Sequence, residues 1–194
     1  MSSANPDTRE KIMKATQALL EDSPGVEVRM SDIAKAAGIS RQAVYLHFPT
    51  RGDLLTGTAR YMDEVLKVDE RLAPSRAAKG EERLELWIEV WGNYIPEIYG
   101  VGRALMAMQQ TDEAAAAAWS DRMQAVRHGC EAAVKALKDA GKLKPDYSVK
   151  QATDALWALQ SVETWEKLRF ECGWSQKAYV TTLKKMAADM LVAR

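Results

Sequence analysis

Apolar residues recur every three or four positions along most of the chain, which is the period of an amphipathic helix. Ile12, Ala15 and Leu19, for example, line one face of a helix that we expect to begin after Pro6. Alternating runs of Val, Ile and Thr, which are typical of strands, do not occur in the sequence. The pattern therefore predicts an all-α protein of about nine helices.

Two short helices are expected after the first one, over residues 30–38 and 40–48. Thr50 and Asp53 form a capping pair, which starts a longer helix expected to run to residue 72. All six Trp residues lie beyond this point, at positions 87, 91, 119, 157, 165 and 174. This shift in composition predicts a small N-terminal domain over residues 1–52 and a larger helical domain over residues 53–194.

Glycine and proline mark the expected helix ends in the larger part. A helix over residues 84–95 is followed by a region that we expect to be broken at Pro96, Gly100 and Gly102. A short helix over residues 103–110 and a long helix over residues 112–140 are expected to follow. Two final helices, one over residues 149–170 and one after Gly173, complete the expected order.

Composition narrows the class of protein. Of the 194 residues, 47% are hydrophobic and 28% are charged, which is typical of a globular protein rather than a disordered or fibrous one. Two cysteines are too few for a disulfide framework, the first residues lack the features of a signal peptide, and no apolar run is long enough to span a membrane. We therefore expect a reduced cytoplasmic protein without a membrane partner.

The segment over residues 31–48 has the spacing of a helix-turn-helix unit. Ala34 supplies the small residue where two helices pack closely, Gly38 the turn, and Val44 the apolar anchor of the second helix. An ordinary corner between two helices would show the same spacing. The total net charge is zero, but residues 33–52 contain the cations Lys35, Arg41 and Arg51, with His47 as a further candidate, and no carboxylate, so a polyanion site would be local.

Residues 38–55 resemble the signature of the TetR family of bacterial transcriptional regulators. The matching pattern is Gly38-Ile39-Ser40, three variable residues and Val44, then Tyr45-Leu46-His47-Phe48 and a basic residue ahead of Asp53-Leu54. The resemblance extends back through residues 31–37 and covers about the first 55 residues. It implies the three-helix DNA-binding domain of that family, followed by a helical ligand-binding and dimerisation domain.

Carried over position by position, the resemblance implies base contacts from Arg41 and Gln42 and phosphate contacts from Tyr45, His47 and Arg51. Tyr45 also fits a packed ring, and His47 fits a residue that packs at the helix end. Because residues 41–43 occupy variable positions of the family, no operator sequence follows from the match. The full set of candidate DNA-binding residues is Arg29, Ser31, Lys35, Ser40, Arg41, Gln42, Tyr45, His47 and Arg51.

The last two expected helices are apolar on more than one face, which indicates that each covers two surfaces. We interpret them as halves of a four-helix bundle between two copies of the chain, as the resemblance also implies. Two helices buried inside a monomer are the alternative. The candidate interface residues are Ala152, Leu156, Leu159, Tyr179, Leu183, Met186 and Met190.

Large rings and thioethers in the larger domain would suit a pocket for a flat apolar effector, although each of them also fits ordinary core packing. The candidate effector-binding residues are Trp87, Trp91, Tyr94, Met106, Trp119, Met123, Trp157 and Glu163. The position of a pocket among them is not specified by the sequence.

These features predict a dimeric regulator that binds a palindromic DNA operator, most simply a repressor released by a small apolar or aromatic ligand. A DNA-binding regulator without a ligand is the alternative. An enzyme is not expected, because the chain has two histidines and none of the common catalytic motifs. His128 and Cys130 point away from each other on a helix, so no metal or cofactor is expected either.

Overall fold

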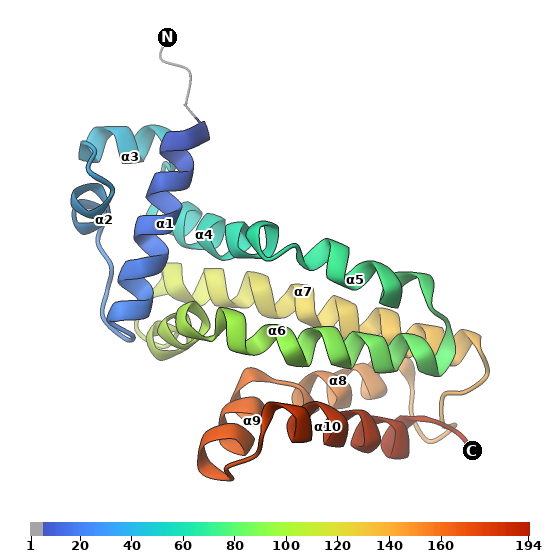
Figure 1. Ribbon diagram of the computed structural model, residues 1–194. Coiled ribbons are helices and arrows are strands. Elements are labelled where there is room, and N and C mark those ends of the chain that lie inside the picture. The colour runs from blue at the N-terminus through green and yellow to red at the C-terminus, as the bar shows by residue number, and fades with distance from the viewer. Residues whose placement is uncertain (1–5) are drawn as a thin grey trace. The chain divides into compact units, whose positions relative to one another are not determined.

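The computed structural model describes residues 6–194, whose regular structure is helical (Figure 1). In chain order the elements are α1 (Pro6–Asp22), α2 (Met30–Ala37), α3 (Arg41–His47), α4 (Arg51–Val65), α5 (Val68–Ala77), α6 (Gly80–Met108), α7 (Glu113–Asp139), α8 (Val149–Leu159), α9 (Val162–Glu166), the π-helical turn η1 (Lys167–Glu171) and α10 (Gln176–Leu191). An isolated antiparallel bridge pairs Leu143 with Val192. The prediction of an all-α fold is confirmed. The expected absence of a signal peptide concerns residues that lie mainly outside those described.

The chain divides into two compact units. The first contains the described residues up to Leu66 together with Ile98–Met123, and the second contains Lys67–Glu97 together with Gln124–Arg194. Each of the long helices α6 and α7 therefore has one end in the first unit and the other end in the second. The boundary predicted at residue 52 is a functional one and stays a prediction, whereas the packing groups α4 with the helices before it.

The first unit is built around the inner faces of α1 to α4. Ile12, Ile33, Val44 and Leu54 are among its buried apolar side chains. Such a set stabilises short helices that would not form alone in water, because helices of this length gain most of their stability from packing. α1 packs against both α2 and α4, and α2 packs against α3 (Figure 1).

The helix expected over residues 50–72 is in fact divided. α4 ends at Val65, and α5 begins at Val68 after Lys67, whose backbone has a φ of 55° in the left-handed region. Glycine commonly marks such a break in a sequence, whereas a lysine does not indicate one. The expected start is confirmed, because Thr50 and Asp53 form a complete capping box at the beginning of α4.

The break expected at Pro96, Gly100 and Gly102 does not occur, because α6 continues from Gly80 to Met108. The two glycines lie instead against side chains of the first unit. A Cβ at position 100 would lie 2.8 Å from Cγ of Glu21, and one at position 102 would lie 3.5 Å from the Trp119 ring. Burial of the helix face here outweighs the helix-breaking tendency of these residues.

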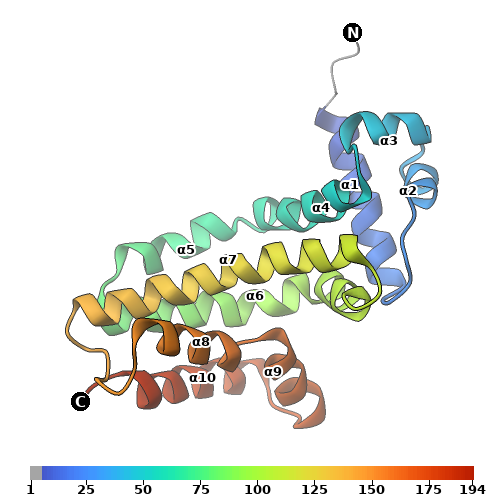
Figure 2. The same ribbon diagram turned by 180° about the vertical axis from the view of Figure 1, so that it is seen from behind.

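The helix expected over residues 149–170 is interrupted at Gln160 and Ser161 in the second unit. The Ser161 hydroxyl accepts a hydrogen bond from the Thr164 backbone N–H and so begins α9. α8 packs against α10, and the two helices lie side by side in both views (Figure 2). No helix in the described part of the chain combines the length and hydropathy that crossing a membrane would require.

Candidate nucleic-acid interface

The turn between α2 and α3 has the geometry that the sequence predicts. Gly38 adopts a left-handed conformation with φ 68°, and its N–H bonds to the carbonyls of Ala34 and Lys35. The Ile39 N–H bonds to the Ala34 carbonyl at 3.0 Å, which completes a Schellman-type end to α2. α3 then starts at Ser40, whose hydroxyl accepts from the Ala43 N–H at 3.1 Å.

One face of α3 is anchored in the core of the first unit. Val44 is fully buried, and Phe48 directly after the helix is 2% exposed. A Cβ at Gly57 of α4 would lie 2.9 Å from the Phe48 ring, and the Arg9 guanidinium of α1 lies 4.8 Å from the centre of that ring. These contacts fix how α3 is rotated about its axis, so that its other face points to solvent.

The outer face of α3 carries a pair of side chains that contact each other. The Arg41 guanidinium donates a hydrogen bond to the Tyr45 hydroxyl at 3.2 Å and lies 5.5 Å from the centre of the Tyr45 ring. This contact raises the pKa of Arg41 above its usual value. Gln42 is exposed beside Arg41 on the first turn of α3. An exposed guanidinium and carboxamide at this position match the donors and acceptors of base edges in a major groove.

The other candidate DNA-binding residues lie in different environments. Arg29, Ser31 and Lys35 are exposed on or just before α2. The Ser40 hydroxyl caps α3, and His47 is half-buried at its end. The structure therefore brings the exposed polar members of the set onto α2, α3 and the residues that flank them.

Arg51 is the exception among the candidates. Its side chain is only 17% exposed and forms an ion pair with Asp112 at 2.7 Å. Its Nε donates to the Val28 carbonyl at 2.7 Å. In this structure its guanidinium thus has protein partners at the place where the resemblance implied a phosphate.

The sequence did not predict a role for two residues that the structure places in this region. Leu46 is 70% exposed on α3, although it lies in the signature between two candidate residues. Its helical position relative to the buried Val44 could have indicated an outward direction. Asp112, the partner of Arg51, could not have been found in this way, because it is 61 positions away in the chain.

The candidate effector residues are largely packed in place. In the second unit Trp87, Trp91 and Tyr94 are buried, Trp157 is half-buried, and Glu163 is exposed. In the first unit Trp119 is buried, and Met106 and Met123 are half-buried. The three buried aromatic residues on α6 thus belong to the core of the second unit.

The candidate interface residues fall into two groups. Four of them are fully buried within one chain and therefore belong to its core: Ala152, Leu156, Tyr179 and Leu183. The other three reach the surface, because Met186 is 45% exposed and Leu159 and Met190 are half-buried. Of the predicted stripe, only Met186, Leu159 and Met190 thus lie on the surface of α8 and α10.

Residues 12–57 match the family model for bacterial regulatory proteins of the tetR family. The chain is 30% identical over 167 residues to the HTH-type transcriptional repressor LfrR of Mycolicibacterium smegmatis, and the match covers 81% of this chain and 78% of that protein. The chain belongs to the TetR family. The structure supports the assignment, because the matched residues contain α2, the turn and α3.

Other relatives match over shorter stretches. The chain is 35% identical over 66 residues to the nucleoid occlusion factor SlmA of Marinomonas sp., covering 34% of either protein. It is 32% identical over 142 residues to the HTH-type transcriptional regulator EthR of Mycobacterium tuberculosis, covering 70% of this chain and 64% of that protein. The chain thus spans less than two thirds of the length of these two relatives.

Solved structures share the fold of the whole TetR-family chain. NalD of Pseudomonas aeruginosa, the secondary repressor of the MexAB-OprM multidrug efflux pump, superposes with a TM-score of 0.70 at 21% identity, over 96% of this chain and 97% of that one. A transcriptional regulator from Saccharomonospora viridis in complex with choline superposes with a TM-score of 0.75 at 18% identity, over 98% and 100% of the two chains. At these identities the likeness concerns the fold alone.

Proposed function

We propose that this protein is a transcriptional repressor that binds a palindromic DNA operator as a homodimer and is released by a small apolar or aromatic ligand. The observation that carries the DNA-binding part is the outward face of α3, where Arg41 and Tyr45 contact each other while Val44 anchors the opposite face. The family membership and the repressors among the relatives support the same proposal.

Arg41 and Gln42 are proposed to contact bases, and Tyr45 to contact a phosphate. Because the Tyr45 hydroxyl accepts a hydrogen bond from Arg41, its own proton remains available for a phosphate oxygen. The exposed Arg29, Ser31 and Lys35 would add contacts to the backbone of the same duplex. No carboxylate lies between residues 33 and 52, so α3 itself carries no negative charge that would repel DNA.

Selection from a pool of random duplex DNA at a stated salt concentration tests this part. An enriched inverted repeat is expected, with half-sites about 34–36 Å apart for reading heads related by a two-fold axis. Arg41→Ala should weaken binding to the enriched site about tenfold and relax the preference at one base pair. Arg76→Ala is the matched control, because Arg76 is also an exposed arginine but pairs with Asp69 on α5. Binding without an enriched motif would contradict the proposal.

The homodimer is proposed to form through the outer faces of α8 and α10. Met186, Met190 and Leu159 supply apolar surface there, and the inner faces of both helices are already buried within the chain. Exposed apolar surface on two packed helices is typical of a surface that a partner covers. Met186→Glu should convert the dimer to a monomer in sedimentation experiments, whereas the exposed Phe170→Glu change on η1 should not.

Ligand response is proposed to act on the aromatic core of the second unit. Buried polar atoms there that have no hydrogen-bond partner among the described residues include the Gln160 Oε1 and the Tyr179 hydroxyl oxygen. Each such atom costs about 1–3 kcal/mol, and a ligand that opens this core and bonds to them would recover part of that cost. The choline complex of the Saccharomonospora viridis protein supports effector binding within this fold.

A panel of small aromatic and apolar compounds tests this part in two steps. A true effector should raise the melting temperature of the protein and release it from the enriched operator at the same concentration. Tyr179→Phe and Gln160→Leu should weaken its binding. If no compound does either, the alternative of a DNA-binding regulator without a ligand would be favoured.

A further inference from the structure

Arg51 joins three segments of the first unit. It is the first residue of α4, its Nε donates to the Val28 carbonyl in the loop before α2, and its two terminal nitrogens contact the two carboxylate oxygens of Asp112 at 2.8 and 2.7 Å. The Nη1 contact is a hydrogen bond between charged groups, and the Nη2 contact is an ion pair. The side chains of Arg51 and Asp112 are only 17% and 13% exposed, so solvent screens the pair little.

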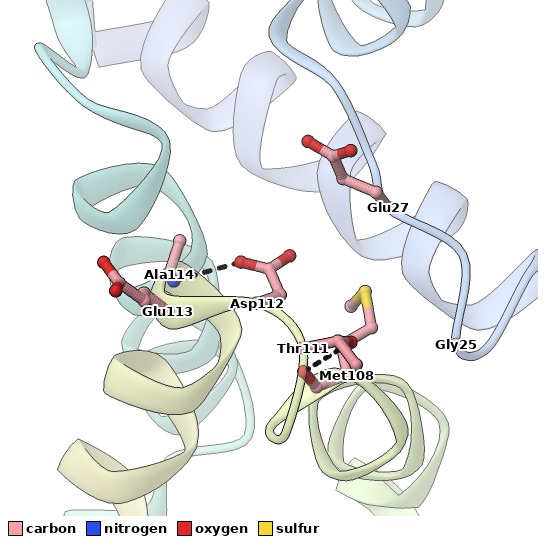
Figure 3. A pocket seen from close by; sticks show the side chains of 7 residues that line it. All are labelled: Gly25, Glu27, Met108, Thr111, Asp112, Glu113 and Ala114. Carbon is pink, nitrogen blue, oxygen red and sulfur yellow. Dashed lines mark hydrogen bonds between the residues drawn. The ribbon is translucent and has the colours of Figure 1, made fainter.

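The first residues of α7 fix the position of the Asp112 carboxylate. Its Oδ1 accepts a hydrogen bond from the Ala114 N–H at 3.0 Å (Figure 3) and another from the Ala115 N–H at 3.2 Å, so the carboxylate caps this helix. The carboxylate therefore fixes Arg51 to a rigid element rather than to a mobile loop. We call the contacts of Arg51 with Val28 and Asp112 the clasp.

The surroundings of the clasp disfavour a phosphate. An open hollow of about 570 Å³ adjoins it, and carboxylates from Glu27, Asp112 and Glu113 are among its lining (Figure 3). A DNA phosphate approaching Arg51 from this side would meet like charges and would have to displace Asp112. Arg41, by contrast, is exposed, and its guanidinium donates to the Tyr45 hydroxyl.

A second ion pair between α4 and α7 can be compared with the Arg51–Asp112 pair. Arg60 of α4 forms two hydrogen bonds to Asp121 of α7, at 3.2 and 2.6 Å. Its partner is again 61 positions away, so α4 and α7 run parallel and in register along both pairs. Arg60 is more exposed, at 57%, and its contacts do not include the α1–α2 loop.

We infer that Arg51 and Asp112 are positioning residues for operator binding, and that Arg51 is not a phosphate ligand. By holding the Val28 carbonyl, the clasp fixes the loop that leads into α2 against the starts of α4 and α7. It thereby sets the orientation in which α2 and α3 meet DNA. This inference rests on the proposed operator binding.

Operator affinity as a function of salt distinguishes a positioning residue from a phosphate ligand. Arg51→Ala, Asp112→Asn and the double variant should each weaken binding by the same amount, about tenfold, because either change opens the same clasp. The slope of log affinity against log salt should not change, since no phosphate contact is lost. Asn at position 112 keeps an oxygen that can cap α7, so the test removes the ion pair and leaves the helix start.

Two further variants sharpen the test. Arg51→Lys should lose nearly as much affinity as Arg51→Ala, because one ammonium group cannot hold both Val28 and the two carboxylate oxygens. Arg60→Ala, the matched control, should stay within about twofold of the wild type. The inference is overturned if Arg51→Ala lowers the salt slope by about one while Arg51→Lys and Asp112→Asn bind normally, or if the losses at positions 51 and 112 are additive.

Hydrogen exchange of the DNA-free protein tests whether the clasp orders the loop before α2, and this test needs no operator. Backbone amides of residues 26–29 and of α2 should exchange faster in Arg51→Ala and Asp112→Asn, but not in Arg60→Ala. Unchanged exchange in these amides would overturn the inference. A wild-type protein that selects no operator would refute the proposed function instead, and the exchange result would still decide whether the clasp orders this loop.

Discussion

The Trp87 ring lies directly over Gly129 of α7 in the second unit. A Cβ at position 129 would overlap Cη2 of Trp87, and the next two nearest atoms also belong to that ring. Trp87 is only 7% exposed, so it has little room to move away. A glycine inside a helix otherwise lowers stability, but at this position it leaves the space that the indole ring occupies.

Gly129→Ala should therefore destabilise the protein by about 1–3 kcal/mol, because the added methyl group over-packs the site. Gly102→Ala is the matched control: it is also a helical glycine against a tryptophan, but its Cβ would lie at an ordinary 3.5 Å from Trp119. That change should stabilise the protein by up to about 1 kcal/mol. Urea unfolding of both variants measures the difference, and equal stabilities would contradict the packing argument.

Tyr179→Phe should leave the stability of the ligand-free protein unchanged or raise it. The hydroxyl is fully buried, has no partner among the described residues, and burial raises the pKa of Tyr179 above its usual range. Removing an unsatisfied buried group relieves a desolvation cost of about 1–3 kcal/mol. Tyr61→Phe should instead lower stability, because the Tyr61 hydroxyl donates to Glu10 at 2.9 Å. Thermal unfolding of the two variants would show opposite shifts, and a clear loss in Tyr179→Phe would mean that its hydroxyl has a partner.

Acid should weaken the Arg51–Asp112 pair in a defined pH range. The Arg51 guanidinium and two backbone N–H groups hold the pKa of Asp112 below its usual value, against the effect of burial. Because the folded pKa is depressed, the stabilisation is fully present above about pH 4 and is lost as the pH falls through the folded pKa. The free energy of unfolding should then fall less steeply below pH 4 in Asp112→Asn than in the wild type. Parallel curves for the two proteins would argue against this coupling.

The two cysteines should differ in reactivity. Cys130 is fully buried, accepts a hydrogen bond from Gln160, and its burial raises the pKa of the thiol to about 12. Cys172 is exposed. Because the thiolate is the reactive form, a thiol reagent such as Ellman's should modify one cysteine in the native protein and two in denaturant. Cys172→Ser should abolish the native reaction, and rapid labelling of that variant would show that Cys130 is accessible.

Local signals along the chain predicted the features that depend on neighbouring residues. The helix-turn-helix spacing of Ala34, Gly38 and Val44, the Ser40 cap and the Thr50–Asp53 capping box all involve partners within a few positions. The interactions that form these features are local, because a left-handed turn favours glycine and an unpaired N–H at a helix start needs a nearby oxygen. The family signature is recognisable from the amino-acid sequence for the same reason, since it consists of these neighbouring residues.

The sequence by itself thus determined the all-α class, the helix-turn-helix and the outward face of α3. Only the tertiary structure decided that α6 runs through Pro96, that Tyr179 and Leu183 lie inside one chain, and that Arg51 turns towards Asp112. Each of these depends on which surfaces meet across long separations in the chain. Burial and ion pairing between such surfaces outweigh the local preferences that a sequence pattern records.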